Sequence, residues 1–388
     1  MQLSYWERKS FMSDVDTVII GAGIVGISAA LSLIEHDPSM KILIIERGFL
    51  PSGASTKNAG FACFGSVSEL LDDFDKMGEE STLNLVARRF AGLAALRKRT
   101  GDDEIFFRPG GNYEVFKTDE EDFFSHCHDN IHRLNRLVKE ITGVDDTYSI
   151  CDKKIQNFGF SDVSHLILNK CEGRLDTGMM MQKLLTLART AGIVFYFGAE
   201  VRQIEDESTK VTLRLQSEYY VEAKQLIVAT NGFARQLLPE LEVFPARNQV
   251  LVTHPYKNMK LDSCFHYDLG YFYWREIDGR ILLGGGRNLF PDTEYTDSLS
   301  INPDIQEHLV QMLKTWITPH EFPGIDMQWS GILGIGKVKF PIIKKISENV
   351  IVAVRMGGMG VALGTLAGHE AAELMLGIST ARTTDVVS

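Results

Sequence analysis

Short runs of apolar residues recur along the chain and predict the strands of a parallel sheet. The runs are VDTVII, KILII, QLIVA and NVIVAV, at 15–20, 41–45, 225–229 and 349–354. Runs of this length that are rich in β-branched residues and lack polar alternation are typical of strands covered on both faces. The first two flank a helical pattern, ISAALSLIEH, that ends at Asp37 and Pro38. Residues 15–46 are therefore predicted to form a βαβ unit with a right-handed crossover.

Between these runs the periodicity changes, and it predicts helices and antiparallel strands. Apolar positions at helical spacing predict helices at 69–100, 120–141, 176–192, 303–318 and 365–376. Alternating patterns predict a hairpin at 105–117, a meander at 200–224 and a β-rich stretch at 245–290. Because the buried strands occur at three separate places, we expect a discontinuous dinucleotide domain with an antiparallel-rich domain inserted twice. The predicted boundaries are 13–85, 165–235 and 325–380 for the first domain, and 86–164 and 236–324 for the second.

Composition and charge narrow the class of protein. With 388 residues, 44% of them hydrophobic and 23% charged, the chain has the usual globular mix and enough length for two domains. The net charge of −11 argues against nucleic acid as a partner, because binding phosphates needs a basic surface. Five scattered cysteines without a CxxC pair suit a reducing cytoplasm. No signal peptide and no apolar run of about 18 residues is visible, so we expect a cytoplasmic protein without an integral membrane segment.

The sequence GAGIVG, directly after the first predicted strand, carries the strongest chemical signal. Gly21 permits a tight turn, Gly23 lets the backbone approach a pyrophosphate, and Gly26 lets helix and strand pack closely. The N-terminus of the following helix offers free N–H groups to the phosphates. Glu46, at the end of the second strand, is placed to bind ribose hydroxyls, and an acid there disfavours the 2′-phosphate of NADP. The alternative is a tight turn without a ligand. FAD and NAD share this motif.

A second glycine cluster, GGMG at 357–360, precedes the last predicted helix. Without bulky side chains the backbone there could touch a flat ligand, and the helix dipole would stabilise negative charge on it. The alternative is close packing of a helix on a strand.

Substrate contacts are predicted on the strand that begins at Tyr271. By the period of two, Tyr271, Tyr273 and Arg275 share one face, where the tyrosines could form an aromatic wall and the guanidinium could bind a carboxylate. The alternative is an ordinary half-buried sheet with an edge ion pair. Arg355, two residues before the GGMG turn, could bind a substrate carboxylate from another strand. The alternative is an arginine that only stabilises the fold. Arg247 is interpreted as a partner in an ion pair at the domain junction.

Other reactive side chains are interpreted as structural. Cys63 is expected to be a small buried thiol. The group His126, Cys127, His128 and His132 lacks an HExxH-type motif, so it predicts a solvated helix face and no metal site. The acidic run 69–80 is also predicted to be solvated surface.

Five blocks of sequence, in order, resemble the superfamily of FAD-dependent D-amino-acid, glycine and sarcosine oxidases. They are DTVIIGAGIVGISAA with IIER, GASTKNAGF, GRLDTGMMMQKLLTLARTAGI, LIVATNGFA, and WSGILGIGKVKFPII followed by NVIVAVRMGGMGVALGTLAG. The resemblance runs from Val15 to about Leu376. Within the superfamily, YFYWREIDGRILLGGG and GGMGVALGTLAG are most similar to the γ-glutamylputrescine oxidase branch, with Met359 where that branch has histidine.

The resemblance implies an α/β protein, α+β overall, with a Rossmann-like FAD-binding domain of the glutathione-reductase type and an interleaved antiparallel-sheet substrate domain. It implies non-covalent FAD and oxidation of an amine or amino acid at its carbon–nitrogen bond, by hydride transfer to flavin N5 and hydrolysis of the imine. The partners would be that small substrate and an electron acceptor, O2 or another. The cofactor would contact Gly21, Ala22, Gly23, Ile24, Val25, Gly26, Glu46, Arg47, Ser55, Thr56, Lys57, Asn58, Ala59, Gly60, Val201, Ala229, Thr230, Gly232, Gly357, Gly358, Met359, Gly360 and Val361; the catalytic candidates are Tyr271, Tyr273, Arg275 and Arg355.

Two positions depart from the superfamily's pattern. Leu333 stands where glycine oxidases have a carboxylate-binding arginine, which puts carboxylate recognition there in doubt. Leu282 aligns with the lysine that sarcosine oxidases use to activate oxygen, so a dehydrogenase is an alternative to an oxidase. The rival functions are an FAD-dependent dehydrogenase of a 2-hydroxy acid or glycerol phosphate, an NAD-dependent dehydrogenase, a non-enzymatic flavoprotein and the flavin half of a tRNA-modifying oxidase; the acidic charge disfavours the last.

Overall fold

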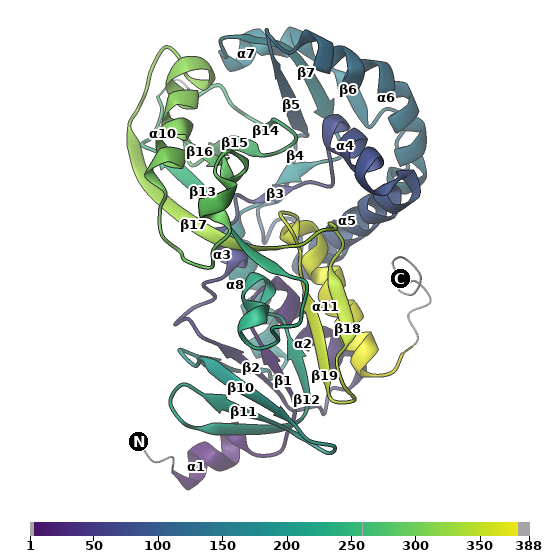
Figure 1. The fold of residues 1–388 in the computed structure, drawn as a ribbon, viewed down its shortest axis with the longest axis vertical. Helices are drawn as coiled ribbons and strands as arrows, with labels where there is room; N and C mark the ends of the chain where they lie inside the picture. The colour runs from purple at the N-terminus through teal and green to yellow at the C-terminus, as the bar shows by residue number, and fades with distance from the viewer. Residues whose placement is uncertain (1–3, 258, 379–388) are drawn as a thin grey trace.

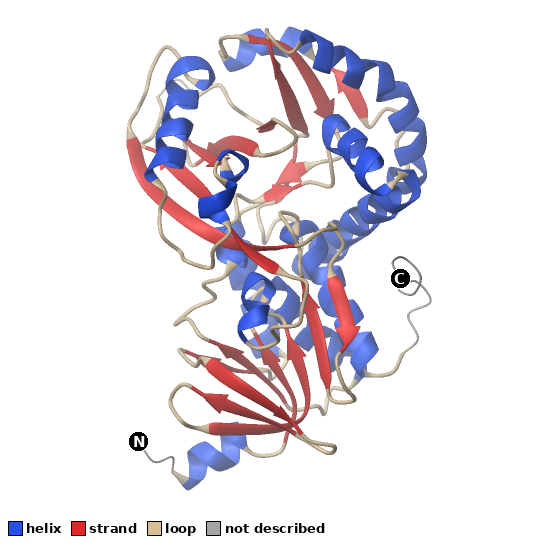
Figure 2. Cartoon of the chain, viewed as in Figure 1, coloured by secondary structure: helices blue, strands red, loops and turns tan. Residues whose placement is uncertain are grey.

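The computed structural model describes residues 4–257 and 259–378 and arranges them as two lobes (Figure 1). The described residues form two eight-stranded sheets, one in each lobe, and a small three-stranded sheet. Chain segments pass repeatedly between the lobes, so neither lobe is one continuous stretch of sequence. Figure 2 shows the first sheet in the lower lobe and the second in the upper one.

The sheet of the lower lobe has a parallel centre in the order β9-β2-β1-β12-β19. β11 pairs antiparallel with the first half of β12, and β10 pairs antiparallel with β11. At the other side, β18 pairs antiparallel with β19. The strands are β1 (Val15–Ile20), β2 (Ile42–Glu46), β9 (Val194–Phe197), β10 (Val201–Asp206), β11 (Val211–Leu215), β12 (Tyr220–Val228), β18 (Ile342–Lys345) and β19 (Val350–Val354).

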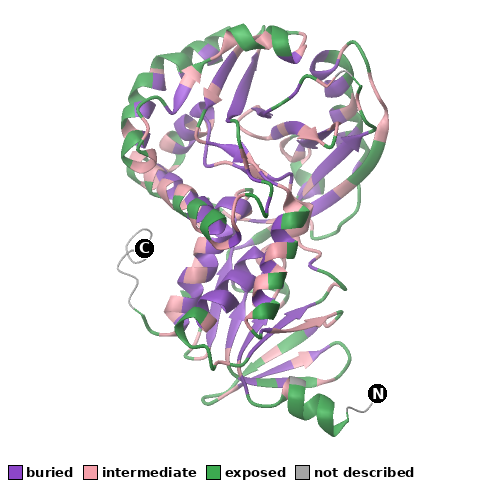
Figure 3. Ribbon diagram, turned by 180° about the vertical axis from the view of Figure 1, so that it is seen from behind, coloured by how far each residue is buried: buried purple, intermediate pink, exposed green. Residues whose placement is uncertain are grey.

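Alternate side chains of the parallel strands pack into two different cores, which is why these strands read as continuous apolar runs. Ile19, Ile44 and Ile227 pack against a layer of helices on one face. Val18 and Leu43 pack against the β10–β12 meander on the other. The predicted βαβ unit and the four predicted buried strands are confirmed, and Figure 3 shows this buried centre from behind.

The helix layer of the lower lobe is held together by very close backbone contacts. It consists of α2 (Ile24–His36), α5 (Glu79–Thr100), α8 (Thr177–Thr190) and α11 (Gly360–Met375). A Cβ at Gly368 of α11 would lie 2.5 Å from the Val25 carbonyl oxygen of α2, and one at Gly92 of α5 would lie 2.0 Å from that of Ala362. Only glycine permits this spacing. The packing brings the N-termini of α2 and α11, far apart in sequence, to the same side of the lobe.

The sheet of the upper lobe has the order β17-β13-β16-β15-β14-β5-β7-β6 and is antiparallel except for the β14–β5 pair. Its side chains pack in an aromatic-rich core that includes Phe265, Trp274 and Trp316. The strands are β5 (Asn112–Lys117), β6 (Tyr148–Ile150), β7 (Val163–Asn169), β13 (Phe244–Thr253), β14 (Cys264–Tyr267), β15 (Phe272–Ile277), β16 (Arg280–Gly285) and β17 (Ile325–Ile335).

The small sheet, β3-β8-β4, lies in the lower part of the upper lobe (Figure 1). It consists of β3 (Phe61–Ala62), β8 (Gly173–Arg174) and β4 (Arg108–Pro109). The remaining helices are α1 (Tyr5–Glu7), α3 (Ala54–Lys57), α4 (Val67–Met77), α6 (Glu121–Thr142), α7 (Ile155–Phe158), α9 (Pro291–Glu294) and α10 (Pro303–Met312). Shorter helical turns span Arg8–Met12, Asp152–Lys154, Asn231–Gln236, Arg287–Leu289 and Leu313–Ile317.

Two expectations about the elements are wrong. The predicted helix 69–100 is two helices, because Gly78 adopts a φ of +81° and separates α4 from α5. The predicted hairpin at 105–117 does not form: β4 pairs with β8, whereas β5 enters the upper sheet beside β7 and β14. The predicted helix 303–318 is confirmed as α10 and the π turn Leu313–Ile317 that continues it.

The sheets also place two segments differently from the predicted domain boundaries. Ile325–Ile335 forms β17, paired along its length with β13 in the upper sheet, although 325–380 was assigned to the FAD-binding domain. β7 likewise belongs to the upper sheet, although residues from 165 onward were assigned to the other domain. Residues 379–380, the end of that predicted domain, lie outside the described residues. The division into two interleaved domains remains our interpretation of the two sheets.

Candidate active site

One cavity of about 690 Å³ runs between the two lobes. It is lined by the first turn of α2, the ends of β1, β2 and β12, the turn before α11, and strands β13, β14 and β17 of the upper sheet. A cavity of this size is within the range for small-molecule and cofactor sites. Parallel strands open their carboxyl ends toward it, the place where open α/β sheets bind ligands.

One part of the cavity wall is the turn between β1 and α2. Gly21 adopts a φ of +109°, and a Cβ there would lie 2.8 Å from the Ala229 carbonyl oxygen. A Cβ at Gly26 would lie 2.0 Å from the Gly21 carbonyl oxygen. The glycines therefore allow the strand, the turn and the helix to meet, as the motif predicts. The Ile24 N–H of the first helical turn donates to Ser55 Oγ at 3.0 Å, so Ser55 ties α3 to this helix N-terminus.

Glu46 ends β2 with its carboxylate at the cavity wall. Its Oε2 accepts the Ala22 N–H at 3.1 Å and its Oε1 accepts the Gly48 N–H at 3.0 Å. These bonds fix the carboxylate beside the turn, where its free acceptor capacity can bind ribose hydroxyls. Next to it, the Arg47 guanidinium lies 3.8 Å from the centre of the Phe233 ring.

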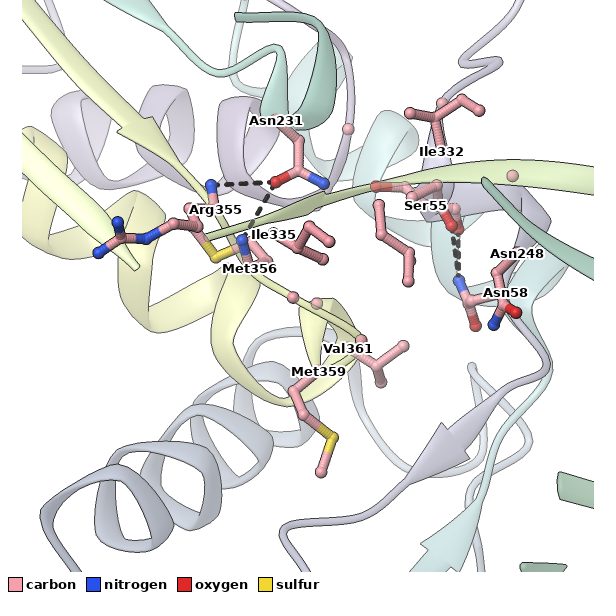
Figure 4. A pocket seen from close by; sticks show the side chains of 18 of the residues that line it. Ser55, Asn58, Asn231, Asn248, Ile332, Ile335, Arg355, Met356, Met359 and Val361 are labelled. Atoms are coloured by element: carbon pink, nitrogen blue, oxygen red, sulfur yellow. Dashed lines mark hydrogen bonds between the residues drawn. The ribbon is translucent and has the colours of Figure 1, made fainter. Parts of the chain in front are cut away.

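The turn before α11, shown in Figure 4, forms another part of the cavity wall. Gly357 and Gly358 line the cavity, and a Cβ at either would meet no atom within 4 Å. Asn231 holds this turn: its Oδ1 accepts the backbone N–H groups of Arg355 and Met356, both at 3.1 Å. The first N–H groups of a helix lack intrahelical partners. The start of α11 is therefore available to a ligand.

The upper lobe supplies hydroxyl and aromatic side chains. Asn248 Nδ2 donates to the Tyr273 hydroxyl oxygen at 2.9 Å, which leaves the Tyr273 O–H free to donate to a ligand. Burial raises the pKa of the Tyr273 hydroxyl, so it keeps its proton. Tyr271 also lines the cavity, with the Arg287 guanidinium 5.1 Å from its ring centre. Phe272 and Trp274 point into the core instead, as the two-residue period predicts.

The structure places the predicted arginines away from a substrate role. Arg275 is not among the cavity-lining residues: its Nε donates to the Ala59 carbonyl at 2.6 Å and its Nη2 to that of Leu175 at 3.0 Å. The Arg355 guanidinium donates to the carbonyls of Phe340 and Glu242 and points away from the cavity (Figure 4). Both side chains hold loops together. For Arg355 this is the structural alternative stated above, whereas Arg275 is buried on two carbonyls and does not form the edge ion pair that was its alternative.

Arg247 forms a buried ion pair, but within the upper lobe and not at the domain junction, where it was expected. Its Nε and Nη2 donate to the two carboxylate oxygens of Glu294 at 2.8 and 2.7 Å. The pair joins β13 to α9, both of the upper lobe.

Other predicted residues divide into those that line the cavity and those that support it. Lining residues include Gly21, Gly23, Ile24, Val25, Glu46, Arg47, Ser55, Lys57, Asn58, Ala59, Val201, Ala229, Thr230, Gly357, Gly358, Met359, Gly360, Val361, Tyr271, Tyr273 and Arg355. Ala22, Gly26, Thr56, Gly60, Gly232 and Arg275 lie behind them. Gly232 is an example: a Cβ there would lie 2.4 Å from the Leu333 carbonyl oxygen, so its small size serves packing.

Sequence reasoning missed an acidic wall. Glu69, Asp72 and Asp73 of α4 line the cavity, although the run 69–80 was predicted to be solvated surface. Asp73 is buried, and its carboxylate lies 2.5 Å from Lys339 Nζ of the segment that follows β17. Burial raises the pKa of the Asp73 carboxyl despite this partner. The amphipathic pattern of α4 gave no signal for this, because it predicts only that the apolar face packs inward.

Sequence reasoning also missed Asn112, Glu172 and His266, which all line the cavity. They come from β5, from the residue before β8, and from β14, and strand pairing brings them together: Cys264 of β14 is opposite Asn112 of β5. Burial raises the pKa of the Glu172 carboxyl to about 8 and lowers the pKa of His266 to about 4. Glu172 directly precedes the GRLD block, but no spacing rule singles it out.

The residues present fit an FAD molecule. The two glycine clusters form two cradles in one cavity, and Glu46 lies beside the first. Gly21, Gly23 and the start of α2 would face the phosphates, and Gly357, Gly358 and the start of α11 would face the ring system.

Comparison with known proteins agrees with this geometry. A family model described as FAD-dependent oxidoreductase, named DAO, matches residues 16–374. The chain belongs to this family. Members are FAD-dependent enzymes, so the DAO-family protein described here is an oxidoreductase that uses FAD.

Individual relatives are distant in sequence. A protein named probable oxidoreductase OrdL, from Haemophilus influenzae, is 22% identical to this chain. The match covers 93% of this chain and 83% of the length of that protein. A crystal structure of glycine oxidase from Bacillus cereus superimposes with a TM-score of 0.74 at 20% identity, covering 94% of this chain and 96% of the other. L-proline dehydrogenase from P. horikoshii superimposes with a TM-score of 0.76 at 17% identity, covering 96% of each chain. These likenesses confirm the predicted fold of the DAO-family protein. Within residues 4–257 and 259–378, no helix has the length and apolarity needed to cross a membrane.

Proposed function

We propose that this DAO-family enzyme oxidises the carbon–nitrogen bond of an amine or amino acid. The observation that carries the proposal is that one cavity joins the FAD cradle to a chamber of polar and aromatic side chains on the upper sheet, including Asn248, His266 and Tyr273. The names of structural neighbours, among them glycine oxidase and iminodiacetate oxidase, agree with substrates of this class.

FAD, when bound, accepts the hydride that leaves the carbon next to nitrogen. This chain's residues position the substrate and keep the site dry. Tyr273 can donate its O–H to the substrate, since its oxygen already accepts from Asn248. Tyr271 and Phe61 supply apolar walls: the Phe61 ring packs edge-on against Tyr273 at 5.5 Å. Leu333, where a carboxylate-binding arginine was sought, lines the cavity as an apolar side chain.

Anaerobic reduction of the FAD-loaded protein tests the proposal. A panel of primary and secondary amines, amino acids, 2-hydroxy acids and glycerol phosphate is mixed with the protein, and loss of the yellow flavin absorbance is followed. We expect bleaching by at least one amine or amino acid and none by the hydroxy compounds. Bleaching by a 2-hydroxy acid or glycerol phosphate alone would support the rival dehydrogenase. Following reoxidation with O2 and with artificial acceptors then separates an oxidase from a dehydrogenase.

A further inference from the structure

Arg287 lines the cavity with a guanidinium group that no carboxylate neutralises. The side chain is half-buried, and its guanidinium lies 5.1 Å from the centre of the Tyr271 ring. Among the described residues it has no hydrogen-bond partner and no ion-pair partner. A guanidinium carries several N–H donors in a planar fork that matches a carboxylate. Donors that the protein leaves unused at a cavity wall indicate a ligand with an anionic group.

Glycines at the end of β16 bring this arginine beside the tyrosines. A Cβ at Gly284 would lie 2.6 Å from a carbon of the Tyr273 ring, and one at Gly285 would lie 2.0 Å from the Tyr271 carbonyl oxygen. The backbone of β16 can run this close to both tyrosines because these two positions have no side chain. The next turn of the chain therefore places Arg287 over the Tyr271 ring.

The turn that carries Arg287 is anchored. Gly286 adopts a φ of +83°, and the helical turn Arg287–Leu289 follows it. Within this turn, Asn288 Nδ2 donates to Asp268 Oδ2 at 2.9 Å, which ties the turn to the loop between β14 and β15. A group that is already held in place loses less conformational freedom when a ligand binds, so anchoring favours affinity.

Two hydroxyl groups accompany the guanidinium at the cavity wall. The oxygen of Tyr273 accepts from Asn248, so its O–H is free to donate. The positive charge of Arg287 lowers the pKa of this hydroxyl, although burial raises it more, so the two groups lie close enough to interact. The Tyr271 hydroxyl has no hydrogen-bond partner among the described residues. One cation with two O–H donors is a donor set suited to a carboxylate.

The acidic residues of α4 do not neutralise Arg287, because other cations hold them. Asp72 pairs with Lys76 at 2.7 Å, and Asp73 pairs with Lys339 at 2.5 Å. The wall opposite the tyrosines therefore carries matched charges. The guanidinium of Arg287 is left as a positive charge that an entering anion can neutralise.

Lys57, the last residue of α3, is a competing place for an anion. It is also half-buried at the cavity wall and has no ion-pair partner among the residues that the structure describes. Its side chain runs along Gly331 of β17, where an added Cβ would lie 3.1 Å from the Lys57 Cβ. No free tyrosine O–H is tied to it by a contact like that between Arg287 and Tyr271, so the observations favour Arg287.

We propose that Arg287 binds the carboxylate of the substrate, with the hydroxyl groups of Tyr271 and Tyr273 as further donors. The substrate is then an amino acid and not a simple amine. Arg287 supplies the charge that Leu333 lacks, from a different strand. This inference rests on the proposed function and narrows its substrate class.

The chain offers a sharp variant and a matched control. Arg287→Met removes the charge and keeps an unbranched side chain, whereas Arg287→Lys keeps the charge and loses the planar fork. Arg235 is the control, because its guanidinium also lies over a ring, 4.8 Å from the centre of Phe244, but it is not among the cavity-lining residues. Arg235→Met therefore repeats the chemistry of the change away from the site.

The probe is trimethylacetate, a carboxylate that has no amine nitrogen and so binds without being oxidised. Its dissociation constant is measured from the change in the flavin spectrum of the FAD-loaded protein, beside the neutral, similarly shaped trimethylacetamide. We expect the wild type and Arg235→Met to bind the carboxylate more tightly than the amide by about tenfold or more. Arg287→Met should abolish this preference, and Arg287→Lys should keep part of it.

FAD content and the unfolding midpoint establish that each variant is folded. Tyr271→Phe should weaken trimethylacetate binding several-fold, and if Arg287→Met loses FAD, then Arg287→Lys and Tyr271→Phe decide. The inference is wrong if folded Arg287→Met binds the carboxylate as the wild type does, or if the wild type shows no preference for the carboxylate. It is also wrong if Lys57→Met removes the preference and Arg287→Met does not.

Failure of this inference is distinguishable from failure of the proposed function. If amines or amino acids bleach the flavin with the same concentration dependence in Arg287→Met and the wild type, the carboxylate role is wrong and the oxidation of the carbon–nitrogen bond stands. If trimethylacetate binds in an Arg287-dependent way but no amine or amino acid bleaches the flavin, the proposed function is wrong and the carboxylate site stands.

Discussion

Asn231 holds the turn before α11, and its replacement makes a quantitative test of how that part of the cavity is built. Its Oδ1 accepts two backbone N–H groups, those of Arg355 and Met356, at 3.1 Å each. Both of these residues are buried. Asn231 itself adopts a φ of +46° and Arg355 a φ of +66°, conformations that cost free energy in residues other than glycine. One side-chain oxygen therefore stabilises two strained positions.

The free-energy cost follows from these contacts. An N–H group left without a partner in the interior costs about 1–3 kcal/mol, and the cavity side allows some access of water, so we expect about 2–4 kcal/mol for the two together. Asn231→Ala adds about 1–2 kcal/mol, because alanine lacks the tolerance of asparagine for positive φ. Asn231→Gly removes the same oxygen without that strain. Asn231→Asp keeps an acceptor and should remain within about 1 kcal/mol of the wild type.

The assay is equilibrium urea unfolding of the protein without FAD, followed by tryptophan fluorescence, together with titration of FAD. The free energy of unfolding should fall in the order wild type and Asn231→Asp, then Asn231→Gly, then Asn231→Ala. FAD affinity should fall in the same order, since the turn at 355–360 lines the cavity. If Asn231→Ala is as stable as the wild type, or if Asn231→Asp is as damaging as Asn231→Ala, the hydrogen bonds do not hold the turn.

Three further predictions concern buried carboxylates. Glu46→Ala removes the acceptor that lies beside the first turn, so FAD affinity, measured by quenching of flavin fluorescence, should fall about tenfold to a hundredfold; an unchanged affinity would contradict its role. Glu294→Gln should destabilise the protein to urea by about 3 kcal/mol, because it leaves the buried Arg247 charge without its partner, whereas apolar replacement of both residues should cost less. The free energy of unfolding should decline as the pH rises from about 4.5 to 8. The folded state keeps protons on Glu114 and Glu172, because burial raises their pKa values to about 7 and about 8. The unfolded state releases the same protons near pH 4.5, so stability is lost across this range. Glu172→Gln and Glu114→Gln should each make this decline less steep in urea unfolding at a series of pH values, and an unaltered slope in both would show that the carboxyls titrate normally.

Local pattern predicted well which residues of the first βαβ unit line the cavity, for a physical reason. The turn of Gly21, Gly23 and Gly26 and the acid at Glu46 lie within one βαβ unit, so their geometry depends on neighbours close in sequence. Buried parallel strands carry an unmistakable apolar pattern, since both of their faces are covered. These features located the FAD cradle without knowledge of the tertiary structure.

The substrate half depended on contacts between distant segments. Arg275 shares the face of Tyr271 and Tyr273 by periodicity, but the carbonyls of Ala59 and Leu175, more than 90 residues away, bind its guanidinium. Periodicity assigns a face of a strand, whereas the partners that a side chain meets there come from other elements. The same limit applies to the hairpin predicted at 105–117, whose two strands pair with other segments of the chain.

By itself, the sequence determined the fold and the family and predicted which turn would face the dinucleotide, because short-range glycine geometry and apolar periodicity are local properties. Only the tertiary structure decided which charges face the cavity. It joined Glu172, Asn112 and His266 from three segments, and it turned the acidic face of α4 toward the cavity. Burial then shifted the pKa values of Glu172 and His266, and burial is a property of the packed protein that no single stretch of sequence contains.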